Sequence, residues 1–99
     1  PTATLSLANA ANVPITGVYF SDCTDAEWGP NRLGAGESIA PGQSRTWAIA
    51  PGCYDVKAST GAKAGQWYDH QVTAGETLQL ELSPAANSLV ARAGAAKAR

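Results

Sequence analysis

Residues 39–52 read IAPGQSRTWAIAPG, so the phrase Ile-Ala-Pro-Gly occurs twice, ten residues apart. Pro41-Gly42 and Pro51-Gly52 each fit the central positions of a type II turn, because proline pre-sets φ near −65° and glycine accepts the positive φ that follows. A spacing of about ten residues is one short strand plus one turn. The stretch predicts an antiparallel β domain, and it says little about activity.

Apolar and polar residues alternate along most of the chain before residue 84, and no segment there has an apolar period of 3.6 residues. We therefore expect an all-β fold, an immunoglobulin-like antiparallel β-sandwich of six to seven short strands, with a small barrel as the alternative. The expected strands are Thr2–Ala8, Val13–Ser21, Ser38–Ala40, Ser44–Ala50, Cys53–Ser59, Gln66–Thr73 and Glu76–Leu82.

The composition changes after residue 83, which divides the chain into a sandwich domain (1–83) and a C-terminal tail (84–99). The tail is rich in alanine and is expected to be extended or a short helix, which Asn87 or Ser88 could cap. We expect it to bind a protein partner through its large apolar and basic residues, Leu89, Val90, Arg92, Lys97 and Arg99.

The two cysteines, Cys23 and Cys53, are too far apart for a CxxC redox or zinc motif. A disulfide between them would stabilise the domain by about 3–4 kcal/mol and would indicate an oxidising compartment. The alternative is two buried thiols in a cytosolic protein. The chain begins at Pro1 without methionine, as a mature exported protein or a chain cut at a domain edge would. We expect a periplasmic or extracellular protein.

The charge pattern and the length of the apolar runs argue against nucleic-acid binding and against a membrane-spanning segment. The net charge is −1, and the basic residues before the tail are scattered rather than clustered, which disfavours nucleic-acid binding. No apolar run approaches the roughly 20 residues that span a bilayer.

An acidic loop offers a weak metal candidate. Asp22, Asp25 and Glu27 lie close in sequence, and a loop could fold them around Ca²⁺, with Asn31 as a further ligand. The spacing is not that of an EF-hand, and aspartate is also common in ordinary loops. We expect no cofactor.

The tryptophans offer a candidate for sugar binding. Trp28 lies in a loop, and Trp67 shares a strand face with Asp69 and Gln71, so either ring could form an exposed platform. The alternative is that they fill the core, because large aromatics in a small domain usually do. Trp47 shares its face with Ile49, which favours the core.

No catalytic group of residues is evident. His70 is the single histidine, and in a regular strand Asp69 would point to the opposite face and could not orient it. We expect His70 to be partly buried and structural. Asp55 starts a strand after a turn, so its carboxylate could accept loop amides and hold the Trp28 loop.

Several of these residues together resemble a group of small secreted bacterial β domains of unassigned function. The shared pattern is Tyr19-x-Ser21, Trp28-Gly29-x-x-x-Leu33-Gly34, Pro41-Gly42 and Gly52-x-Tyr54-Asp55-Val56. The resemblance covers about residues 13–59, and it implies an export signal and a β-sandwich but no activity. Members often carry the second cysteine on a later strand, whereas here it is in the loop, at Cys23.

The function expected from the sequence is a non-enzymatic accessory or structural subunit of a larger envelope complex, acting through protein–protein contacts. Exposed strand edges in such a fold would also permit β-augmentation. The alternatives are a carbohydrate-binding module and a Ca²⁺-stabilised β domain.

Overall fold

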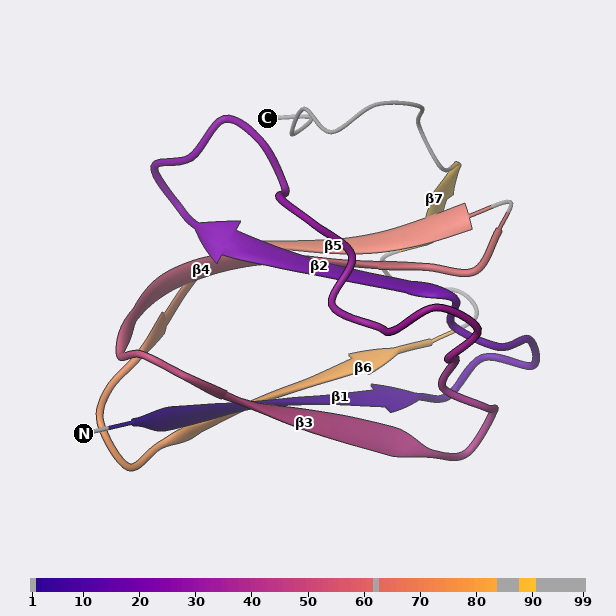
Figure 1. Cartoon of the computed structure of the whole chain (residues 1–99), viewed down its shortest axis with the longest axis horizontal. Coiled ribbons are helices and arrows are strands. Elements are labelled where there is room, and N and C mark those ends of the chain that lie inside the picture. Colours follow the sequence, from indigo (N-terminus) through magenta and orange to yellow (C-terminus); the bar gives the residue numbers. More distant parts are fainter. Residues whose placement is uncertain (1, 62, 84–87, 91–99) are drawn as a thin grey trace.

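The computed structural model describes residues 2–61, 63–83 and 88–90, and within them all regular structure is β. The strands form two layers, a three-stranded sheet in the order β3-β1-β6 and a four-stranded sheet in the order β2-β4-β5-β7 (Figure 1). The expected all-β fold is therefore confirmed. The strands are β1 (Ala3–Asn9), β2 (Gly17–Asp22), β3 (Ser44–Ile49), β4 (Gly52–Ser59), β5 (Lys63–Val72), β6 (Thr77–Leu82) and β7 (Ser88–Val90).

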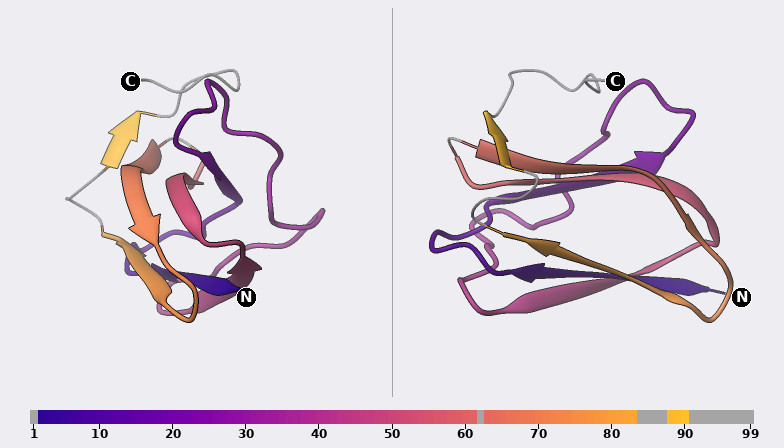
Figure 2. Two further views of the ribbon diagram at one scale, coloured as in Figure 1. Left: turned by 90° about the vertical axis from the view of Figure 1, so that its left-hand side faces the viewer. Right: turned by 180° about the vertical axis from the view of Figure 1, so that it is seen from behind.

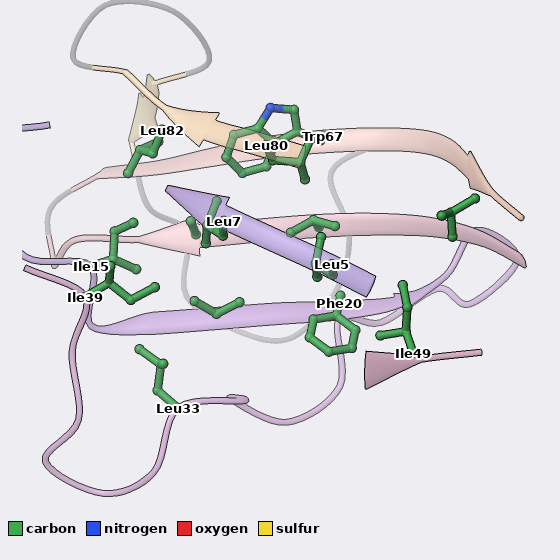
Figure 3. Close-up of a cluster of buried hydrophobic side chains, with 14 of the residues drawn as sticks. Leu5, Leu7, Ile15, Phe20, Leu33, Ile39, Ile49, Trp67, Leu80 and Leu82 are labelled. Atoms are coloured by element: carbon green, nitrogen blue, oxygen red, sulfur yellow. The ribbon is translucent and has the colours of Figure 1, made fainter. Parts of the chain in front are cut away.

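The hydrophobic core lies between the two layers. In β1 buried and half-buried residues alternate strictly, and Leu5 and Leu7 have no exposed surface. Phe20 of β2 comes from the opposite sheet, and its ring packs edge-on against Trp47 with 5.8 Å between centroids. Leu33 joins the same cluster from the long segment between β2 and β3 (Figure 3).

One strand pair departs from the expected antiparallel arrangement. β1 pairs antiparallel with β3 but parallel with β6, with Leu5 beside Leu78 and Leu7 beside Leu80. The chain reaches β6 from β5 in the other sheet, so no hairpin fixes its direction relative to β1 (Figure 2). The expectation of purely antiparallel sheets is wrong at this pair.

The repeated Pro-Gly phrase forms two different structures. At the first, Gly42 has φ of 85° and the Gln43 amide donates to the Ala40 carbonyl at 3.0 Å, as a type II turn requires. At the second, Gly52 has φ of 158° and is already the first residue of β4. The second type II turn is therefore absent, because the chain there crosses from β3 to the other sheet.

Two expected strands are shorter than their sequence patterns. β2 begins at Gly17, and upstream of it Ile15 forms only an isolated bridge with Ile39, which is all that remains of the strand expected at 38–40.

β7 lies within the expected tail and pairs with residues 63–65 of β5. Arg92, Lys97 and Arg99 fall outside the described residues. The part of the chain that the structure describes holds no helix able to cross a membrane.

Candidate functional site

The two cysteines form a disulfide at the start of the long segment that follows β2. The Cys23 and Cys53 sulfurs are bonded, with 5.5 Å between the Cα atoms, and the Cys23 amide donates to the Cys53 carbonyl at 3.2 Å. The predicted pairing is confirmed. The Asp69 carboxylate lies within 4.8 Å of both sulfurs, and this is the one such group of possible metal-ligand atoms among the described residues. Sulfurs in a disulfide are not thiolate ligands, so the group does not form a metal centre.

The acidic loop is arranged as a turn. Asp22 accepts hydrogen bonds from the Thr24 amide at 2.9 Å and the Thr24 hydroxyl at 2.7 Å, so its carboxylate stabilises the turn that leaves β2. Asp25 and Glu27 are exposed, and Glu27 offers its backbone carbonyl to the Ser21 hydroxyl at 2.9 Å. The structure does not bring the three carboxylates together around one point.

Trp28 is buried on the outer side of the four-stranded sheet rather than in the core between the layers. Only 1% of Trp28 is exposed. Its ring packs against Tyr68 with 5.6 Å between centroids, and the Lys57 amine lies 5.4 Å from the centroid of the Trp28 ring. The same amine lies 4.7 Å from the centroid of the Tyr19 ring, and burial lowers the pKa of Lys57. The loop thus covers part of this sheet, and Trp28 has no free ring face on which a sugar could stack.

Trp67 is also buried, and the expectation that it shares an exposed face with Asp69 and Gln71 is wrong. Trp67 belongs to the core cluster, with 9% of its surface exposed. The cause is a β-bulge, in which Tyr68 and Asp69 of β5 both lie opposite Asp55 of β4. An extra residue in one strand reverses which side chains point inward. Trp67 therefore points into the sandwich, whereas Gln71 is exposed.

A buried carboxylate stabilises this bulge. Asp55 has no exposed surface, and its carboxylate accepts the Asp69 backbone amide at 2.9 Å. Asp69 has φ of 59°, a left-handed conformation that aspartate tolerates better than most residues. Asp55 therefore has a structural role through the backbone of β5, and its expected contact with the Trp28 loop stays a prediction. His70 follows the bulge, is half-buried as expected, and lies in register with Tyr54.

Asn31, which the sequence suggested only as an additional cation ligand, instead holds the long loop against the free edge of β2. Its side-chain oxygen accepts the Val18 amide at 3.0 Å and the Leu33 amide at 3.1 Å. The Arg32 amide donates to the Val18 carbonyl at 2.7 Å, and the Arg32 guanidinium donates to the Phe20 carbonyl at 2.9 Å. The loop therefore satisfies backbone groups that an edge strand otherwise exposes.

The outer face of the three-stranded sheet is not covered by a described loop, unlike the outer face of the four-stranded sheet, and most of its side chains are small and polar. We call this surface the open face. The central residues from β1 are half-buried, and those from β3 and β6 are exposed. One of its residues is charged, and no described segment lies below the sheet in Figure 1. The open face consists of Thr4, Ser6, Ala8, Ser44, Thr46, Ala48, Thr77, Gln79 and Glu81.

No family model, curated protein or solved structure matches the chain.

Proposed function

We propose that this protein is a non-enzymatic accessory or structural subunit that works through protein–protein contacts in a larger complex of the cell envelope. The open face is the surface that we assign to the partner. The observation that carries the proposal is the difference between the two outer sheet faces, of which one is partly covered by its own loop and the other is bare.

The chemistry of the open face suits contact with another protein. Its three rows across the sheet are Ala48-Thr4-Thr77, Thr46-Ser6-Gln79 and Ser44-Ala8-Glu81. Short side chains lose little rotamer freedom when they are covered. With Glu81 at one edge, the centre around Ser6 is neutral.

The disulfide supports an oxidising compartment, either the periplasm or the exterior of the cell. The segment that carries Trp28, Leu33 and Ile39 begins at Cys23 and is therefore tied covalently to β4. A domain that depends on this bridge for stability fits an exported protein better than a cytosolic one. We propose a periplasmic or extracellular location on that basis.

We further infer that the sandwich is immunoglobulin-like. In immunoglobulin constant domains one sheet has the strands ABED and the other CFG. If β1, β2, β3, β4 and β5 correspond to B, C, E, F and G, with β6 in the place of strand A, the three-stranded sheet has the order A-B-E without a described strand D. The four-stranded sheet then has the order C-F-G followed by β7. The Tyr54 hydroxyl donates to the Ala50 carbonyl at 2.6 Å between β3 and β4, where these domains have a tyrosine corner.

The tail is the second element of the proposal. Leu89 and Val90 lie in β7, opposite Ala64 and Lys63 of β5 respectively, and the basic residues follow them in sequence. We propose that residues 91–99 add to partner binding. Removing residues 91–99 while keeping β7 tests this part separately.

Charge insertion at the centre of the open face tests the main proposal. In Ser6→Lys an ammonium replaces the central hydroxyl, so at least a tenfold loss of partner is expected when the chain is purified from its native envelope fraction. Gln71→Lys adds the same charge to an exposed position on β5 and is the matched control. Full partner recovery with Ser6→Lys, while the variant remains folded, would contradict the proposed surface.

A further inference from the structure

The outer edge of β3 is a free strand edge within the described chain. β3 pairs only with β1 there, because it ends its sheet. The Asn9 amide donates to the Gln43 carbonyl at 2.9 Å, which fixes the alternation of hydrogen-bonded pairs along the ladder. The backbone groups of Arg45, Trp47 and Ile49 consequently face β1. Those of Ser44, Thr46 and Ala48 face outward.

This edge differs from the edge of β2 on the same side of the molecule. At β2 the side chain of Asn31 and the backbone of Arg32 occupy the outward groups of Val18. At β3, by contrast, no described loop donates to or accepts from the backbone of Ser44, Thr46 or Ala48. Proline residues and β-bulges on an edge strand usually prevent it from pairing with another chain. β3 has neither of them along its pairing with β1.

We propose that β3 pairs antiparallel with β3 of a second copy of this chain, about a two-fold axis at Thr46. Such an isologous pair joins identical surfaces and closes as a dimer. In this register Thr46 lies opposite its own copy, Ser44 lies opposite Ala48, and Arg45 lies opposite Trp47. The two three-stranded sheets then form one continuous sheet.

The side chains of β3 are complementary to themselves in this register. Within one chain the Arg45 guanidinium already lies over the Trp47 ring, 5.7 Å from its centroid, and Trp47 remains half-exposed. Pairing brings each Arg45 beside the Trp47 of the other copy, where cation–π contacts can form across the interface. An inward-facing charge on an edge strand normally opposes pairing. Here Glu37 neutralises Arg45 at 2.9 Å, and the register keeps the two arginines from facing each other.

Cysteine cross-linking tests this register directly. Cα atoms of directly opposite residues in a hydrogen-bonded antiparallel pair lie about 5.5 Å apart, within reach of a disulfide. Under mild oxidation Thr46→Cys is expected to yield a covalent dimer, seen as a doubled intact mass that reverts on reduction. Gln79→Cys places a thiol at the middle of β6, the opposite edge of the same sheet, and is the matched control. Cross-linking of Gln79→Cys but not of Thr46→Cys would overturn the proposal.

Sedimentation of the unmodified chain provides the second test. The wild-type chain is expected to show a concentration-dependent monomer–dimer equilibrium. Thr46→Pro removes an amide that faces the free edge and leaves the bonds to β1 in place, so it should be monomeric. Should Thr46→Pro fail to fold, Thr46→Lys places like charges opposite each other and is expected to weaken the dimer at least tenfold. A wild-type chain that stays monomeric across the concentration range would overturn the proposal.

The two proposals fail separately. The dimer is measured with the purified chain alone, whereas the envelope partner is measured by recovery from its native fraction. Ser6 lies on the central strand β1 and does not reach the β3 edge, so Ser6→Lys is expected to lose the partner and keep the dimer.

Discussion

The buried carboxylate of Asp55 on β4 accepts the backbone amide of Asp69 on β5 at 2.9 Å, at the bulge that turns Trp67 into the core. This contact stabilises the bulge, whose extra residue reverses the inward-facing side of β5. Removing the carboxylate leaves the Asp69 amide without that acceptor at a partly buried site. We expect Asp55→Ala to lower the free energy of unfolding by about 2–3 kcal/mol.

Chemical denaturation with urea measures this loss. Asp55→Asn keeps a side-chain oxygen and should be less destabilised than Asp55→Ala. Asp25→Ala removes an exposed carboxylate and should change the free energy of unfolding by no more than about 0.5 kcal/mol. Equal stability of Asp55→Ala and wild type would show that the carboxylate does not hold the bulge.

The disulfide should contribute a comparable amount. Cys23 and Cys53 are separated by 30 residues, and closing a loop of that length corresponds to about 3–4 kcal/mol on the chain-entropy account. The double variant Cys23→Ser/Cys53→Ser should therefore lose about that much free energy of unfolding, measured by urea denaturation against wild type. If the reduced wild-type chain and the double variant were both as stable as the oxidised chain, this assignment would be wrong.

Trp28 should behave as a structural residue. Because only 1% of it is exposed, Trp28→Ala is expected to cost about 3–5 kcal/mol of stability, whereas Trp28→Phe keeps an aromatic ring against Tyr68 and should cost less. Circular dichroism melting of both variants checks this order. A fully stable Trp28→Ala would mean that the ring is exposed in solution, and glycan titration followed by tryptophan fluorescence would then become informative.

The turn before β3 should depend on backbone conformation rather than on space. Gly42 has φ of 85°, and a Cβ built there meets nothing within 4 Å. Gly42→Ala should cost about 1–2 kcal/mol, which is the penalty of a left-handed residue. Gly42→Asn should cost less, because asparagine tolerates this region. A lower urea midpoint for Gly42→Asn than for Gly42→Ala would contradict the type II turn.

Glu37 should add to the acid sensitivity of the domain. The hydrogen bond from the Gly34 amide, followed by the interaction with Arg45, lowers the pKa of Glu37 from its usual 4.5. A folded-state pKa below the unfolded one means that the stabilisation is present above the usual pKa and is lost as the pH falls through the lowered value. Glu37→Gln should show a shallower loss of stability in acid, measured as the urea midpoint against pH. Since Glu37 is exposed, we expect the difference between the two proteins to be small. If the urea midpoint fell equally steeply with pH in wild type and Glu37→Gln, Glu37 would not contribute to acid sensitivity.

Much of the fold could be predicted because alternation is a local signal. Leu5 and Leu7 alternate with polar neighbours, and β1 is found within one residue of the expected range. The pairing of Cys23 with Cys53 followed from there being only two cysteines.

The remaining features depend on contacts that are distant in sequence. Trp67-Tyr68-Asp69-His70 contains no glycine to indicate a bulge, and the buried carboxylate that stabilises the bulge comes from Asp55 on the neighbouring strand. The side chain of Asn31 binds β2 across 13 residues, which no local pattern reveals. The parallel direction of β6 is likewise set by the other sheet from which the chain arrives.

Native mass spectrometry of the envelope fraction of the source cells, after gentle extraction, would show whether the chain belongs to a larger complex. We expect the 10.1 kDa chain to be bound to at least one other protein there, and Ser6→Lys to release it. A chain found only as free monomer, or only as a dimer of itself, would contradict a role as a subunit of a larger complex.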